Sequence, residues 1–188
     1  TPSLAQTTSS VWYPGKLLMA VPLPFHQRYH LYVVTHLVLA VLAALAAARA
    51  AGLSPSAALL CGISYGFAGT VLFQIYNVVY LVGAAWLPLG LIAAERVVAR
   101  ASVRAVAGLW AVLSLMTLGA VPPAAYHTGL LSFLYSWIRV PHLARLATLR
   151  WLLGRWGLLS AAALLGFLLA AAQILPAIEW ARQSDRAA

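Results

Sequence analysis

The sequence predicts an all-α fold: a polytopic transmembrane helical bundle with about six spans and a non-cytoplasmic N-terminal loop that carries short surface helices. The first observation is composition, since 63% of the 188 residues are hydrophobic and only 8% are charged, with a mean hydropathy of +0.89. Globular domains carry roughly 25% charged residues. Because this small number of charged residues cannot cover the apolar surface in water, a lipid bilayer is the expected solvent. The second observation is that the basic residues alternate with the apolar runs as membrane topology requires.

Residues 1–28 precede the first span and form the most polar and turn-rich part of the chain. Pro22 and Pro24 break any long helix here. Trp12 and Tyr13 are residue types that settle at the boundary between membrane and water. We predict a non-cytoplasmic loop with short helical pieces that lie on, or dip into, the membrane surface.

Six apolar runs follow, and the third is the clearest. It holds about 17 almost uncharged residues and is followed by Arg96, Arg100 and Arg104. A hydrocarbon core of roughly 30 Å needs about 20 apolar residues of helix, and tilt covers a small shortfall. The fifth run is short for a full crossing and is expected to tilt. The predicted spans cover about residues 29–48, 56–73, 78–94, 103–118, 124–138 and 156–175, and a non-cytoplasmic tail covers 176–188.

The second run contains Gly62, Gly66 and Gly69. Small residues at this spacing let a neighbouring helix approach closely in a membrane. His36 falls inside the first run, where we predict that it forms an interhelical hydrogen bond. We therefore expect close helix packing around the first two runs.

Basic residues indicate the orientation of this layout. The connections after the first, third and fifth runs hold eight arginines, and the opposite side holds four basic residues. Basic residues near span ends resist translocation, so this division places both termini outside the cytoplasm. The eight are Arg49, Arg96, Arg100, Arg104, Arg139, Arg145, Arg150 and Arg155, and the four are Lys16, Arg28, Arg182 and Arg186.

Several function classes are disfavoured by the sequence. The net charge is +9, but the basic residues are scattered over short loops and form no basic helix, so no nucleic-acid partner is expected. Cys61 is the single cysteine, which excludes an internal disulfide and a cysteine metal site. There is no metal-ligand spacing, nucleophile elbow or phosphate-cradling glycine loop. No cofactor is identified, and a divalent metal is not supported by the sequence.

Candidate binding residues gather on the predicted non-cytoplasmic side. Lys16, Arg28, Arg182 and Arg186 would hold a phosphate through charge-assisted hydrogen bonds. Contact with lipid headgroups is an equally good interpretation of these four cations. The composition makes the lipid bilayer an expected partner of the chain whichever of the two these cations contact.

Catalytic candidates are weaker. His127 follows Tyr126 just inside the fifth run, where a histidine is more often a hydrogen-bonded packing residue. Glu179 is one of three acidic residues and is a candidate base or metal ligand. Its spacing from Arg182 also suits an ion pair on a helix. Spacing alone therefore identifies no catalytic motif.

Blocks that together cover nearly the whole chain are similar to one known family. They are LAQTTSSVWYPGKLL with PLPFHQRYHLYVVTHLVLA, then GISYGFAGTVLFQIYNVVYLVGAAWLPLGLIAAER, and later LGAVPPAAYHTGLLSFLYSW and AAAQILPAIEWARQSDRAA. These blocks resemble the outer loops and spans of YfhO-like bacterial membrane proteins, which are grouped with the GT-C glycosyltransferases. The chain departs from the family's Gly-Asp-Pro-Gln pattern, because Val121 and Pro123 stand where an acid and a glutamine are usual.

The resemblance implies transfer of a sugar from a polyprenyl-phosphate donor to a cell-envelope acceptor, at the outer face of the bacterial cytoplasmic membrane. In such a mechanism a carboxylate activates the acceptor hydroxyl and cations stabilise the leaving lipid phosphate. The family's first span and acidic catalytic motif would lie before Thr1, so we expect this chain to be a piece of a longer protein. The residues expected to contact the lipid phosphate are Lys16, Arg28, Tyr126, Arg182 and Arg186.

Two other function classes stay open. A transporter or flippase would carry ionisable residues at mid-span, and the predicted spans hold almost none, which disfavours it. A non-catalytic membrane scaffold is compatible with the missing acidic motif. The sequence therefore leaves enzymatic activity undecided.

Overall fold

The computed structural model describes residues 9–119, 122–140 and 145–182, and every regular element within them is a helix. The predicted all-α class is therefore confirmed. The elements are η3 (Pro14–Ala20), α1 (Phe25–Ala50), α2 (Pro55–Gly66), α3 (Gly69–Leu72), η4 (Phe73–Tyr76), α4 (Val78–Arg100), α5 (Val103–Leu118), α6 (Pro122–Ile138) and α7 (Arg145–Arg182).

Local signals in the sequence set several helix ends. Ser54 and Ser102 are the N-caps of α2 and α5, and their hydroxyls accept bonds from Ala57 N (3.3 Å) and Ala105 N (3.2 Å). Helix α4 stops at Ala101, which adopts a left-handed conformation (φ 46°). This conformation reverses the chain at once into α5.

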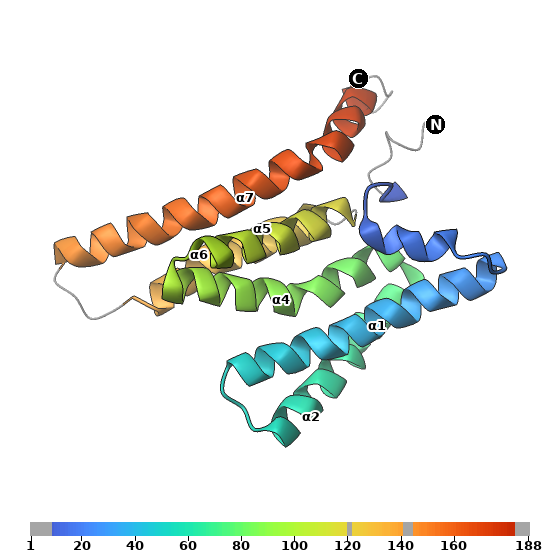
Figure 1. The fold of residues 1–188 in the computed structure, drawn as a ribbon, viewed down its shortest axis with the longest axis horizontal. Coiled ribbons are helices and arrows are strands. Elements are labelled where there is room, and N and C mark those ends of the chain that lie inside the picture. Colours follow the sequence, from blue (N-terminus) through green and yellow to red (C-terminus); the bar gives the residue numbers. More distant parts are fainter. Residues whose placement is uncertain (1–8, 120–121, 141–144, 183–188) are drawn as a thin grey trace.

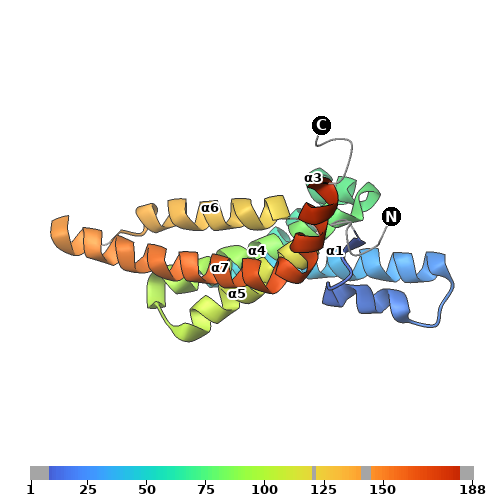
Figure 2. The same ribbon diagram turned by 90° about the horizontal axis from the view of Figure 1, so that it is seen from above.

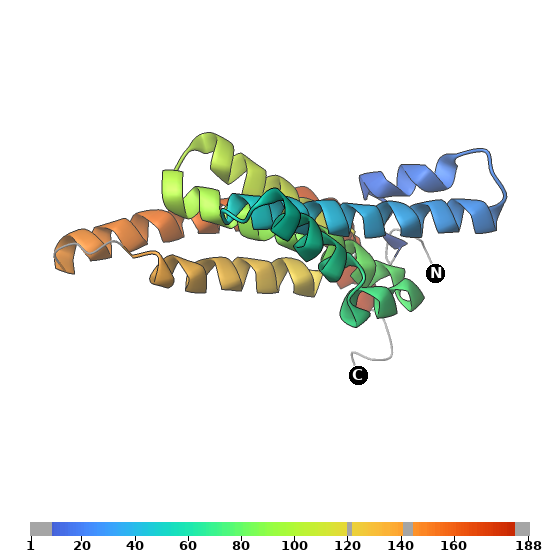
Figure 3. The same cartoon turned by 90° about the horizontal axis from the view of Figure 1, so that it is seen from below.

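The long helices run roughly along one axis of an elongated bundle, and α2 is inclined to it (Figure 1). Helix α7 runs along one side, and its first turns project past the neighbouring helices in all three views (Figures 1, 2 and 3). Helices α1 and α2 lie on the side away from α7, with α4 between (Figure 1). Segment η3 folds back along the beginning of α1.

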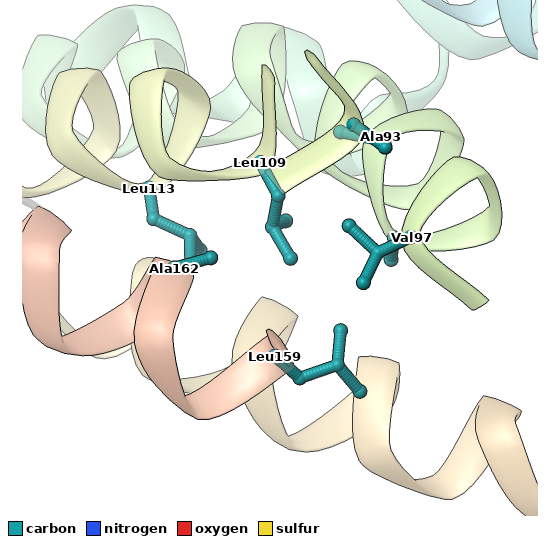
Figure 4. Packing of buried hydrophobic residues seen from close by; sticks show 8 residues of the cluster. Ala93, Val97, Leu109, Leu113, Leu159 and Ala162 are labelled. Carbon is teal, nitrogen blue, oxygen red and sulfur yellow. The ribbon is translucent and has the colours of Figure 1, made fainter. Parts of the chain in front are cut away.

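One core cluster joins α4, α5 and α7 (Figure 4). Alanines allow the three backbones to approach, and leucines from α5 and α7 fill the space between them. Its labelled members are Ala93 and Val97 from α4, Leu109 and Leu113 from α5, and Leu159 and Ala162 from α7. A second cluster joins α1, α3 and α4 through Val33, Ala40, Val71, Leu81 and Ala85.

The glycines of α2 pack closely on α1. A Cβ atom added at Gly62 or Gly66 would collide with Val41. The predicted close approach is confirmed at these two positions. It is wrong at Gly69, where an added Cβ would meet no atom within 4 Å.

The predicted number of six spans is wrong. Among the described residues, three helical stretches are long and apolar enough to cross a membrane: Phe25–Ala50, Val78–Arg100 and Ala147–Trp180. A fourth arises if Pro55–Gly66 and Gly69–Tyr76, which meet at a bend of 44°, form one broken span. The protein therefore has three to four candidate membrane spans, which suggests a membrane location.

The fourth and fifth predicted spans do not qualify, for two physical reasons. Helix α5 has 16 residues, about 24 Å at 1.5 Å per residue, which falls short of a hydrocarbon core of roughly 30 Å. Helix α6 has 17 residues. It also carries polar side chains along its length, among them His127, Thr128, Ser132 and Ser136.

Helix α7 differs most from the predicted boundaries of 156 and 175. It begins eleven positions earlier, at Arg145, because Trp151, Leu152 and Leu153 continue the helix between the arginines. It also continues through Pro176, where the missing N–H removes one hydrogen bond without ending the helix. The region predicted to be a basic connection is thus partly helical.

The outward faces of the helices are strongly apolar. On α7 the exposed side chains include Leu164, Leu165, Phe167, Leu168 and Leu169. Water does not favour so large a continuous apolar surface. These faces suggest contact with a lipid bilayer.

Candidate functional site

A cavity of about 310 Å³ lies where η3 meets the beginnings of α1 and α4. Its size is at the lower end of the roughly 300–1,000 Å³ of small-molecule sites. The lining residues are Ser10, Lys16, Met19, Phe25, Arg28, Tyr29, Tyr32, Val78 and Val79. The cavity therefore combines two cations with an aromatic and aliphatic wall.

Arg28 is held in the wall of the cavity by one of its donors. Its Nη1 donates to the carbonyl oxygen of Met19 at 2.7 Å. Its Nε is buried and has no hydrogen-bond partner among the described residues. That Nε–H is enclosed by protein, so an anion in the cavity would be met by the other donors of this half-buried guanidinium.

Lys16 faces the same cavity from η3. Its Nζ lies 5.7 Å from the centroid of the Tyr32 ring, which is within the range of a cation–π contact. No acidic side chain is among the residues that line the cavity. The two cations therefore give the site a positive potential.

A chain of hydrogen bonds runs beneath the cavity and connects the N-terminal segment to α1 and α4. Trp86 Nε1 donates to the Tyr13 hydroxyl (2.9 Å), which lies 2.8 Å from His36 Nε2. His36 Nδ1 lies 2.8 Å from the carbonyl oxygen of Tyr32. A carbonyl only accepts, so in the neutral imidazole Nδ1 carries the proton and Nε2 accepts from the Tyr13 hydroxyl. The indole N–H of Trp86, the hydroxyl of Tyr13 and both ring nitrogens of His36 thus each have a hydrogen-bond partner.

These side chains are deeply buried. Only 4% of Tyr13 and 2% of His36 are exposed. Burial raises the pKa of the Tyr13 phenol above its ordinary value, and the bond from Trp86 offsets part of that change. Both ring nitrogens of His36 are engaged, so the imidazole has no free nitrogen for a reacting group. The prediction that His36 forms a hydrogen bond is confirmed, although its side-chain partner lies in the segment before α1.

The other predicted site residues do not line the cavity. Tyr126 and His127 lie in the first turns of α6 and are exposed, with ring centroids 5.6 Å apart. Glu179 and Arg182 are exposed near the end of α7. Arg186 lies outside the described residues, as does Val121. Of the five residues expected to contact a lipid phosphate, the structure brings Lys16 and Arg28 together.

The arginine-rich end of the bundle holds an ion pair. Arg139 Nη2 donates to Glu95 Oε1 at 3.0 Å and joins the ends of α6 and α4. No group of three or more potential metal ligands occurs in the part of the chain that the structure describes.

The aromatic and aliphatic walls of the cavity were not predicted from the sequence. Arg28 and Tyr32 are four residues apart on α1 and therefore share one face of the helix, which is a readable signal. The reversal of the chain between η3 and α1, which brings Lys16 to that face, has no such signal. The sequence therefore did not predict that Phe25 and Tyr29 line a cavity together with Lys16.

Comparisons with protein-family models, with curated proteins and with solved structures give no match. Fold kinship therefore carries no information about the site. The functional conclusion rests on the chemistry of the cavity and on the candidate spans.

Proposed function

We propose that this chain is part of an integral-membrane glycosyltransferase-like protein of the GT-C/YfhO type. The cavity would bind the phosphate of a polyprenyl-phosphate sugar at the outer face of the membrane. The observation that carries the proposal is that Lys16 and Arg28 line one cavity and that none of the described acidic side chains lines it with them.

The chemistry required of the cavity is electrostatic. As a sugar is transferred, negative charge develops on the lipid phosphate that leaves, and preorganised cations stabilise that charge. Lys16 would supply a point charge, and the half-buried guanidinium of Arg28 would supply directed hydrogen bonds. The family resemblance implies a carboxylate that activates the acceptor hydroxyl, and no acidic side chain of the described residues lines this cavity.

The orientation follows from the distribution of arginines. Arg96, Arg100, Arg104 and Arg139 lie at or beside the ends of α4, α5 and α6 that are remote from the cavity. Retention of these arginines in the cytoplasm would leave the cavity at the outer face. This placement suits an acceptor in the cell envelope.

Cysteine labelling on intact bacteria tests the orientation. In a Cys61→Ser background, Leu23→Cys lies in the exposed link between η3 and α1, and Ser102→Cys lies between α4 and α5. A membrane-impermeant maleimide should label Leu23→Cys in intact cells and Ser102→Cys only after lysis. The reverse pattern would place the cavity on the cytoplasmic side and overturn the proposed outer-face reaction.

Binding of farnesyl phosphate to the purified protein in detergent tests the site. Loss of a charge-assisted hydrogen bond costs about 1.5–3 kcal/mol, or roughly 10- to 100-fold in affinity. Lys16→Ala and Arg28→Gln should each weaken binding by at least about 10-fold. Farnesol, which lacks the phosphate, should bind no more tightly to the wild type than to these variants.

Arg49→Gln is the matched control. Arg49 Nη1 also donates to a backbone carbonyl at 2.7 Å, that of Leu53, but at the opposite end of α1. It should bind farnesyl phosphate like the wild type. Absence of binding by the wild type, or an equal loss in Arg49→Gln, would refute the site. Binding without sugar transfer by the full-length protein would favour the non-catalytic scaffold.

A further inference from the structure

The short helix η3, which carries Lys16, is hydrogen-bonded to α1 near both of its ends. Tyr13 precedes its first residue and bonds to His36, and the carbonyl of Met19 near its end accepts from Arg28. The backbone N–H of Lys16 donates to the carbonyl oxygen of Tyr13 at 2.9 Å. Lys16 therefore lies between two fixed points.

Tyr13 also contacts other helices of the bundle. The Tyr13 ring belongs to a buried cluster that includes residues of α1, α4, α5 and α7. Its hydroxyl adds the bond from Trp86 on α4 and the bond to His36 on α1. One side chain thus links η3 to two helices whose beginnings form the wall of the cavity.

We propose that Tyr13 and His36 are positioning residues, whose hydrogen bond holds η3 so that Lys16 faces the cavity. This inference rests on the proposed phosphate site. Neither residue lines the cavity, so each acts through the position of Lys16. The phosphate affinity of the site then depends on a hydroxyl that never contacts the ligand.

The hydroxyl can be removed without removing the ring. Tyr13→Phe keeps the apolar contacts of the ring but leaves Trp86 Nε1 and His36 Nε2 buried without their partner. Leaving buried polar groups unpaired is costly, whereas η3 opening toward water would satisfy them. The variant should therefore shift η3 toward open conformations.

Labelling of Lys16→Cys in a Cys61→Ser background measures this opening without any ligand. Lys16 is half-buried in the closed arrangement. Adding Tyr13→Phe should raise the rate of maleimide labelling at this position by about 5-fold or more, since a lost buried hydrogen bond shifts an opening equilibrium by at least that factor. An unchanged labelling rate would overturn the inference.

Farnesyl phosphate affinity provides the second readout, and Tyr65→Phe is its matched control. The Tyr65 hydroxyl donates to the carbonyl oxygen of Ala84 at 2.8 Å and joins α2 to α4 away from the cavity. Tyr13→Phe should weaken binding by roughly 5- to 10-fold, and Tyr65→Phe should leave it unchanged. Equal losses would reveal a general loss of stability and overturn the positioning role.

A double variant shows whether the hydroxyl acts through Lys16. In the Lys16→Ala background, Tyr13→Phe should cause little further loss of affinity, because the group that it positions is absent. Fully additive losses would contradict the inference. If Tyr13→Phe does not accumulate, Trp86→Phe takes its place. It removes one of the two bonds to the Tyr13 hydroxyl and is tested by the same labelling and affinity measurements.

The two proposals fail in different ways. If the wild type does not bind farnesyl phosphate, the proposed function fails, while the labelling experiment still decides whether Tyr13 holds η3. Binding measurements with inorganic phosphate and with vesicles of phosphatidylglycerol distinguish a free phosphate, a lipid headgroup and a lipid-linked donor as the ligand. Binding of inorganic phosphate alone would exclude a contribution from the lipid chain, and preference for phosphatidylglycerol would indicate a headgroup contact in place of a lipid-linked donor.

Discussion

Replacement of Gly62 by alanine tests the close packing of α2 on α1. A Cβ atom built at Gly62 would lie 2.7 Å from the carbonyl oxygen of Val41 and 3.0 Å from Cβ of Leu45. Because the first contact is with backbone, the helices must separate. Overpacking costs about 1–3 kcal/mol, and the better helix propensity of alanine returns about 0.5–1 kcal/mol. The difference between these two ranges is about 0–2.5 kcal/mol, and the backbone contact favours the upper part of it, so we expect Gly62→Ala to destabilise the protein by about 1–2 kcal/mol.

Thermal unfolding in detergent, followed by tryptophan fluorescence, measures this change. A loss of 1–2 kcal/mol corresponds to a decrease in Tm of about 2–8 °C for a chain of this size. Gly154→Ala in α7 is the matched control, since an added Cβ there meets no atom within 4 Å. It should be neutral or slightly stabilising.

A companion variant separates backbone from side-chain contact. A Cβ atom at Gly66 would lie 2.3 Å from Cγ2 of Val41, which Val41→Ala removes. Val41→Ala should therefore rescue Gly66→Ala but not Gly62→Ala, whose contact is with the carbonyl oxygen. A Tm of Gly62→Ala equal to that of the wild type, or equal rescue of both variants, would refute this account of the packing.

Three further predictions concern the N-terminal segment and the ion pair. Gly15→Ala should lower Tm by about 2–8 °C, because its Cβ would lie 2.3 Å from the Tyr13 ring. The folded-state pKa of Tyr13 is raised, so its contribution to stability is full below the unfolded pKa of about 10 and is lost as pH rises through the folded value. The difference in Tm between wild type and Tyr13→Phe should therefore stay constant from pH 7 to about 9.5 and shrink above pH 10; a constant difference at higher pH would contradict this. Arg139→Ala should change Tm by less than about 4 °C and less still in high salt, because about half of the Arg139 side chain is exposed to solvent (51%).

The sequence predicted those parts of the fold that depend on local signals. The bounds of α5 match the predicted run at 103–118, because Ser102 caps one end and Gly119 follows the other. Apolar length likewise identified α1 and α4. The break between α2 and α3 was not predicted, although the glycines that permit it were noted.

The cavity could be predicted only in part. Lys16 and Arg28 were recognised as potential phosphate ligands from their charge, but the cation–π contact and the free Nε depend on how the chain turns back between η3 and α1. Tyr126 and Arg182 were grouped with them because all were expected on one face of the membrane. A shared face does not place residues in one cavity, since that depends on the packing of η3 against two helices.

Helix α7 has 38 residues, which is about 57 Å along the helix and nearly twice the thickness of a hydrocarbon core, and it bends near its C-terminal end (Figure 2). Its first turns project beyond the other helices (Figure 2). A helix of this length cannot lie entirely within the hydrocarbon core unless its axis is strongly tilted from the membrane normal. Because α7 also packs against the Tyr13 cluster through Ala170 and Ile174, one continuous helix connects the projecting end of the molecule with the cluster that lies beside the cavity.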